Sequence, residues 1–188
     1  MERLIKDIRN CTNCASQIDH TPRPIIQISS QSQLLIIGQA PGRKVHESGI
    51  PWDDASGKRL RSWLGVADDE FYNPKNIGLI PMSFCYPGMG KSGDLPPLKD
   101  CAPLWFDQLF KHLTEVKLTL LIGMYSQEHF LGKDKLTLTE RVMNFESYLP
   151  KYLPLPHPSP RNIRWFKNNP WFEEKVIPKI QKVVKGLK

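Results

Sequence analysis

Two polar loops, each placed directly after an apolar stretch, hold the residues best suited to chemistry. The first loop follows Leu34–Ile37 and contains Gly38-Gln-Ala-Pro-Gly42, then an aromatic at Trp52 and carboxylates at Asp53 and Asp54. Its proline and glycines cannot continue a strand, because proline lacks the ladder N–H and glycine adopts unusual dihedrals. Open α/β sheets bind their ligands at the carboxyl ends of strands. The first loop is therefore a candidate site.

The second loop is His157-Pro-Ser-Pro-Arg-Asn162. Prolines flank both its histidine and its serine, so the loop is stiff and presents the imidazole at a fixed geometry. The next residues mix cations with aromatic rings: Arg164, Trp165, Phe166 and Lys167. Such a mixture is typical of a surface that contacts phosphates and stacks bases. The alternatives are a proline-rich surface turn and, for the two aromatic residues, positions in the core.

The cysteines are spaced like the ligands of a metal site. Cys11 and Cys14 form a C-x-x-C pair, and Cys85 and Cys101 follow much later. Four thiolates suit zinc or an iron–sulfur cluster, and the spacing alone does not choose between them. The alternative is four unrelated small apolar residues.

Strand-like and helix-like segments alternate along the chain. The predicted strands are 33–38, 77–82, 118–122 and 152–155. The predicted helices are 2–10, 57–64, 103–113, 125–131, 138–145 and 170–188, with Ser56 as the cap of helix 57–64. Strands separated by helices indicate a three-layer α/β fold, with a central four-stranded, mostly parallel sheet flanked by helices. We expect a single domain over residues 1–188.

The charge and the hydropathy pattern limit the class of protein. The 188 residues carry a formal net charge of +7, which favours a polyanionic partner. No apolar run is long enough to span a bilayer, and the N-terminus lacks the layout of a signal peptide. We therefore expect a cytoplasmic monomer without a membrane partner, its cysteines reduced or bound to metal.

The two loops resemble the active-site motifs of the uracil-DNA glycosylase superfamily. The resemblance rests on Gly38-Gln-Ala-Pro-Gly42, Gly49-Ile-Pro-Trp52 and His157-Pro-Ser-Pro-Arg-Asn162. The cysteine spacing is similar to that of family 4, the branch in which four cysteines hold a four-iron four-sulfur (4Fe-4S) cluster. The last motif looks like that of the single-strand-selective monofunctional uracil glycosylases. The similarity runs from Cys11 to about Phe172.

The resemblance implies a role for each matched residue. Trp52 would stack on a base flipped out of the helix, and His157 would hydrogen-bond that base as it becomes anionic. Asp54, or main-chain groups at Gln39, would position the attacking water. The remaining roles are base binding by Ala40 and Asn162 and DNA binding by Ser159, Arg161, Arg164 and Lys167. Cys11, Cys14, Cys85 and Cys101 would hold the cluster.

The sequence departs from the superfamily pattern at three places. Ala40 stands where the best-known members have a water-activating Asp or Asn, although the family 5 enzymes also have alanine there. Pro81 stands near the position of the asparagine that reads uracil, and proline has no side-chain donor. Val45-His-Glu47 replaces an acidic run of family 4. Asp53 and Asp54 can equally begin and cap a helix.

Two functional hypotheses follow from these residues. The first is a monofunctional DNA glycosylase that excises uracil or another deaminated base. The second is a catalytically inactive, cluster-bearing nucleic-acid-binding protein of the same fold, which Ala40 and Pro81 favour. The two differ in one observable, the release of a base from damaged DNA.

Overall fold

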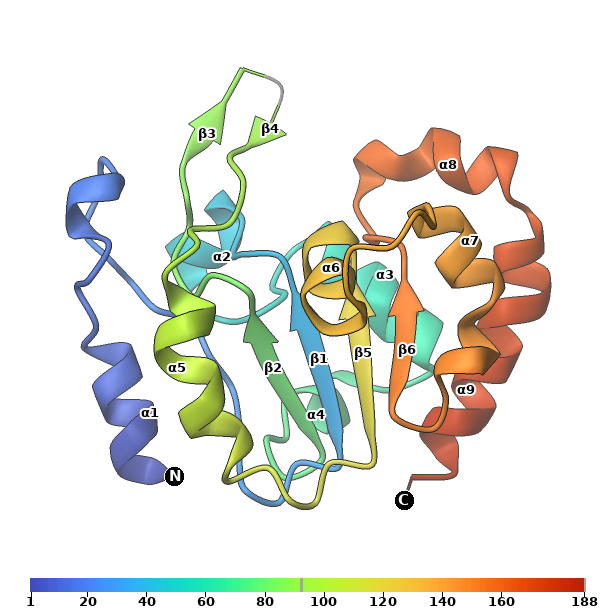
Figure 1. Ribbon diagram of the computed structural model, residues 1–188, viewed down its shortest axis with the longest axis horizontal. Helices are drawn as coiled ribbons and strands as arrows, with labels where there is room; N and C mark the ends of the chain where they lie inside the picture. The colour runs from blue at the N-terminus through green and yellow to red at the C-terminus, as the bar shows by residue number, and fades with distance from the viewer. Residues whose placement is uncertain (92, 188) are drawn as a thin grey trace.

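A computed structural model gives the architecture of the chain and describes residues 1–91 and 93–187. Its centre is a four-stranded sheet in the order β2-β1-β5-β6, in which all neighbours are parallel (Figure 1). The strands are β1 (Leu34–Gly38), β2 (Ile77–Pro81), β5 (Leu118–Ile122) and β6 (Tyr152–Leu155). The predicted three-layer α/β fold is confirmed.

Helices cover both faces of this sheet. The α-helices are α1 (Glu2–Arg9), α2 (Arg43–Ser48), α3 (Ala55–Leu64), α4 (Asp68–Phe71), α5 (Cys101–Phe110), α6 (Met124–Leu131), α7 (Leu138–Met143), α8 (Ile163–Asn168) and α9 (Ile177–Lys185). Short 3₁₀ turns are η1 (Ala15–Gln17), η2 (Phe145–Tyr148) and η3 (Pro160–Asn162), and a π-helical turn, η4 (Phe172–Val176), precedes α9. Among the helices that the structure describes, none combines the length and apolar character needed to cross a membrane.

The strand residues alternate between two apolar cores, as the pleat requires. Leu34 and Ile36 point into the core that also holds the inner faces of α3, α7 and α9. Leu35 and Ile37 point into the other core, against α1 and α5. Both faces of β1 are thus buried, which explains why this strand is an unbroken apolar run.

The secondary structure differs from the predictions in several details. The helix expected at 57–64 begins at Ala55, and the helix expected at 103–113 covers Cys101–Phe110. The C-terminal segment contains η4 followed by α9, and residue 188 lies outside the described residues. A small antiparallel hairpin, β3 (Met89–Gly90) and β4 (Gly93–Asp94), was not predicted; Figure 1 shows it beyond the carboxyl ends of β1 and β2.

Candidate active site

A cavity of about 430 Å³ opens at the carboxyl edge of the sheet. Its lining comes from the loop after β1 (Gly38–Val45), the turn before α3, the end of β2, the β3–β4 hairpin and the loop after β6. Both loops singled out from the sequence therefore meet at one place. We call this cavity the base pocket, after the base-binding role that the sequence resemblance predicts for residues in its lining.

Trp52 and His157 lie next to each other in the base pocket. Their ring centroids are 5.7 Å apart, and the ring planes are inclined by 31°. Trp52 precedes α3 and His157 follows β6, so the fold brings together residues that are far apart in the sequence. A planar ligand that stacks on the indole thereby has the imidazole within reach.

Glycines make the space that the Trp52 side chain and backbone occupy. Trp52 has φ of +59° and is the one described residue other than glycine with a positive φ. Such strain concentrates at functional sites and must be held by its surroundings. A Cβ at Gly38 would lie 2.9 Å from the indole, and a Cβ at Gly57 would collide with the Trp52 carbonyl oxygen. Gly38 and Gly57 therefore fix the position of the indole.

Asp54 both lines the base pocket and caps α3. Its backbone is extended, and its Oδ1 accepts a hydrogen bond of 2.8 Å from the Gly57 N–H. The prediction that Ser56 caps this helix is wrong, because Ser56 already lies within the first turn. Asp53 is exposed and does not line the pocket. Asp54 is thus a structural cap whose second carboxylate oxygen remains available for another partner.

The imidazole of His157 is kept neutral by its surroundings. Burial lowers the pKa of His157, and the carboxylates of Asp54 and Asp94 offset this only in part. The loop is also held from within, since the Asn162 side-chain amide donates to the His157 carbonyl oxygen at 2.8 Å. His157 is therefore a neutral, fixed hydrogen-bond group near pH 7.

Asp94 is a pocket residue that sequence reasoning missed. It ends the β3–β4 hairpin and lines the base pocket. The Tyr86 hydroxyl donates to its Oδ1 at 3.5 Å, and the Arg161 guanidinium packs against the backbone of Gly93. The glycines around Met89 were the available signal, because closely spaced glycines mark a tight turn.

The predicted site residues of the two loops and α8 fall into two groups, inside and outside the lining of the base pocket. Gln39, Ala40, Ser159 and Arg161 line the base pocket with Trp52, Asp54 and His157. Asn162, Arg164 and Lys167 do not line the base pocket. Arg164 and Lys167 are exposed residues of α8.

The aromatic residues of α8 belong to the core instead of the surface. Trp165 and Phe166 are partly buried and pack against the core beside α3 and α9. The Trp165 Nε1–H donates to the Thr139 hydroxyl at 2.9 Å, and Phe166 makes an edge contact with Trp63. Of the two interpretations of these rings, the structure supports the core positions.

Val45-His46-Glu47 lies in α2, behind the base pocket. Val45 lines the pocket, while His46 and Glu47 do not. The His46 ring makes an edge contact with His20 at 4.6 Å. Burial, together with the nearby His20 and Arg23, lowers the pKa of His46. This segment therefore supports the pocket from outside.

The four cysteines line one small cavity beside α5. Cys11 is partly exposed, the other three are buried, and none forms a disulfide. Burial and the neighbouring Cys14 raise the pKa of Cys85 to about 12. Among the residues that the structure describes, no group of three or more His, Cys, Asp or Glu side chains is arranged to hold a metal ion. Four sulfur donors around one cavity fit a thiolate-ligated group in their chemistry.

The family comparison agrees with the fold and with the two loops. Residues 26–181 match the family model described as the uracil DNA glycosylase superfamily. The matched range includes both loops of the base pocket and Cys85 and Cys101, and begins after Cys11 and Cys14. It covers well over half of the chain, and the chain therefore belongs to the uracil-DNA glycosylase superfamily.

Proposed function

We propose that this protein is a monofunctional DNA glycosylase that hydrolyses the N-glycosidic bond of uracil or another deaminated base. The observation that carries the proposal is that Trp52 and His157 lie side by side in one pocket, with their ring centroids 5.7 Å apart. Membership of a superfamily of DNA glycosylases supports the reaction class and the DNA substrate. A base must leave the stack to reach such a pocket.

The reaction requires one bond to break and one to form at the anomeric carbon. The C1′–N bond breaks, and its electron pair leaves with the base. His157 donates a hydrogen bond that strengthens as negative charge grows on the base, and this stabilises the transition state. Water attacks C1′, its oxygen forms the new C1′–O bond, and one of its protons passes to an acceptor. The base anion takes up a proton on release.

The water has two candidate partners in the pocket. The Asp54 carboxylate can accept its proton, since only Oδ1 is engaged by the Gly57 N–H. Main-chain groups at Gln39 can hold the water instead, since the family 5 resemblance at Ala40 implies no side-chain activator at that position. The two possibilities differ in the effect of Asp54→Asn on the rate of base release. The rate should fall severely if the Asp54 carboxylate activates the water, and only slightly if main-chain groups at Gln39 hold it.

The identity of the base is open to purines as well as uracil. Pro81 ends β2 and lines the base pocket, and its ring offers neither a donor nor an acceptor. A base is therefore read by other groups, of which the side chains of Gln39 and Asp94 are candidates. Xanthine and hypoxanthine belong in any substrate test beside uracil.

A substrate panel tests the proposal against its alternative, an inactive nucleic-acid-binding protein. Oligonucleotides carrying uracil, xanthine or hypoxanthine are incubated with the protein and then treated with alkali. Cleavage at the modified position is expected for at least one base, as single strand or duplex. Binding to these oligonucleotides without cleavage of any would instead support the inactive protein, which Ala40 and Pro81 favour.

We further propose that Cys11, Cys14, Cys85 and Cys101 hold a 4Fe-4S cluster, with structural zinc as the alternative. The four thiols line one cavity, which supports a shared group, and the choice of iron–sulfur rests on the resemblance to family 4. The group would join the N-terminal segment to the loop after β2. It contributes folding energy in such sites and takes no part in the hydrolysis proposed above.

Anaerobic purification tests the cluster. The protein should be brown, with broad absorption at roughly 400 nm. Cys85→Ala should lose the colour and yield less folded protein, because metal binding and folding are coupled. Colourless protein with stoichiometric zinc would contradict the iron–sulfur cluster and support structural zinc. Folded protein without any metal would contradict both proposals.

Binding to DNA is expected to depend steeply on salt. Each phosphate neutralised contributes about −0.9 to the log–log slope for duplex DNA and about −0.7 for a single strand. Arg161→Gln, Arg164→Gln and Lys167→Gln should each make the slope shallower by about one such increment. Lys111→Gln, on the exposed residue that directly follows α5, is the control and should leave it unchanged. Salt-independent binding would exclude nucleic acid as the partner.

A further inference from the structure

A second cavity, of about 440 Å³, adjoins the base pocket. The two cavities share Gln39 and His157 in their linings, and both lie at the carboxyl edge of the sheet. The second cavity continues from there to the start of α6, the start of α7 and Trp165 on α8. A strand that places one nucleotide in the base pocket thus has its next nucleotide near this space.

The second cavity is lined by neutral groups and aromatic rings. Its lining contains no Asp, Glu, Lys or Arg among the described residues. Tyr125 is 41 % exposed, and its side chain makes neither a hydrogen bond nor a ring contact with another described residue. The Trp165 ring is fixed by its hydrogen bond to Thr139. Phosphates are bound mainly by cations and N–H groups, whereas bases stack on rings. The lining therefore suits a base better than a phosphate.

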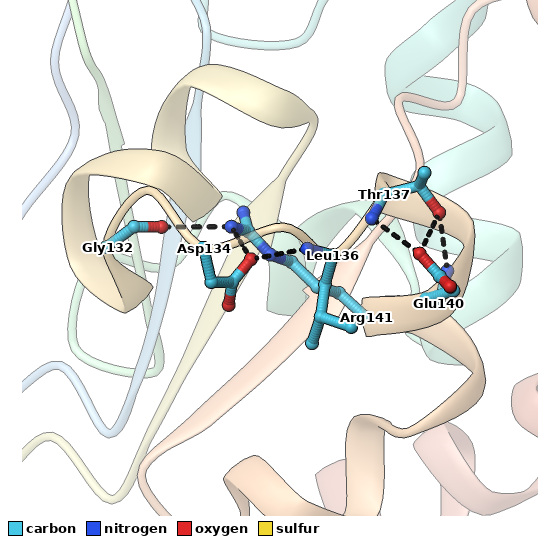
Figure 2. A network of polar contacts seen from close by, with 6 residues as sticks. All are labelled: Gly132, Asp134, Leu136, Thr137, Glu140 and Arg141. Carbon is cyan, nitrogen blue, oxygen red and sulfur yellow. Dashed lines mark hydrogen bonds and ion pairs between the residues drawn. The ribbon is translucent and has the colours of Figure 1, made fainter.

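The wall of this cavity at Thr137–Thr139 is held in place by a polar network. The buried Arg141 guanidinium donates to the Gly132 carbonyl oxygen at 2.9 Å and to Asp134 at 2.7 Å. Figure 2 shows these contacts beside the start of α7. Thr137 and Glu140 form a capping box at the start of α7. A preformed wall reduces the ordering cost of binding.

We propose that the second cavity binds the nucleobase next to the excised one on the same strand, with Tyr125 as its stacking partner. This rests on the proposed function, since it assumes that the damaged base enters the neighbouring pocket. A base that is paired and stacked in a duplex cannot enter a cavity on the protein. The site therefore selects an unpaired strand, from which two adjacent bases are turned toward the protein.

Binding measurements with single-stranded oligonucleotides test this site without requiring catalysis. Each fluorescent oligonucleotide carries one uracil and one baseless tetrahydrofuran residue, placed directly 5′, directly 3′, or several nucleotides away. For the wild-type protein, the tetrahydrofuran on one adjacent side should weaken binding by about 5- to 150-fold, as expected for one lost stacked base. The distant tetrahydrofuran should have no effect.

Tyr125→Ala should bind the oligonucleotide with the distant tetrahydrofuran as weakly as the wild type binds the one with the adjacent tetrahydrofuran. The variant should no longer distinguish these two oligonucleotides. Met143→Ala, which removes an exposed side chain of α7 outside both cavities, is the control and should behave as wild type. The proposed site would be overturned if the wild-type protein bound all the oligonucleotides equally or bound none of them. It would also be overturned if Tyr125→Ala distinguished adjacent from distant tetrahydrofuran as well as the wild type does. If bases are excised without any neighbour effect, this inference fails and the proposed function stands.

Discussion

Replacing His157 by alanine is expected to lower the single-turnover rate of base release by about 100- to 1000-fold, the usual cost of losing one transition-state donor. DNA affinity should stay nearly unchanged, because the hydrogen bond strengthens only as the base becomes anionic. The neutral imidazole, kept so by burial that lowers the pKa of His157, is suited to this role. Rapid-quench kinetics and fluorescence anisotropy on the same substrate measure the two quantities separately.

The control for this variant is His112→Ala, since His112 is exposed and lines neither cavity. It should retain the wild-type rate. An unchanged rate in His157→Ala, or a loss of rate explained entirely by weaker DNA binding, would contradict the role assigned to His157.

Gly57→Ala is expected to disrupt the base pocket although Gly57 does not line it. The added methyl group would collide with the Trp52 carbonyl oxygen, so the strained turn that carries the indole must move. Overpacking of this kind costs about 1–3 kcal/mol, and in a chain of this size each kcal/mol lowers Tm by about 2–4 °C. Base release should fall strongly, because displacement of the indole removes the stacking surface.

Gly186→Ala provides the matched control for Gly57→Ala. Gly186 follows α9 with φ of −78°, and its nearest atoms to an added Cβ lie at 3.5 Å, an ordinary contact. The activity and Tm of the Gly186→Ala variant should remain close to those of the wild-type protein. Wild-type activity in Gly57→Ala would show that the position of Trp52 is not required for the reaction.

The sheet was predictable from the sequence because its strands are apolar runs that end at glycine or proline. Leu34–Ile37 and Leu118–Ile122 read as buried strands, and the structure places them side by side. The two loops after β1 and β6 were found for the same reason, since the end of a parallel strand marks where a site can form.

The sequence did not predict the features of the fold and site that depend on very short segments or on tertiary contacts. The β3–β4 hairpin has two residues in each strand, too few for a periodic pattern, so Asp94 was missed. Asp54 and Ser56 are both good caps, and only the observed backbone selects Asp54. In the six residues of α8, cations and rings alternate so closely that periodicity cannot separate surface from core.

The second cavity could not be seen in the sequence at all. Its lining combines residues that follow β1, β5 and β6 with the start of α7, and no local pattern connects them. Only the parallel sheet, which collects the carboxyl ends of its strands at one edge, brings these segments together.

The mass of the DNA strand after reaction, measured before any alkali treatment, tests the central claim most directly. The protein is incubated in ¹⁸O-labelled water with the oligonucleotide on which the substrate panel shows activity. Hydrolytic excision should give free base together with a full-length strand in which the base is replaced by one ¹⁸O-bearing hydroxyl at C1′. Neither loop motif contains a lysine, and Lys44, which lines the pocket, is an exposed residue of α2 outside both motifs, so we expect no Schiff base and an intact strand. A cleaved strand, a covalent protein–DNA adduct, or an unchanged mass of this oligonucleotide would contradict hydrolytic base excision by this protein.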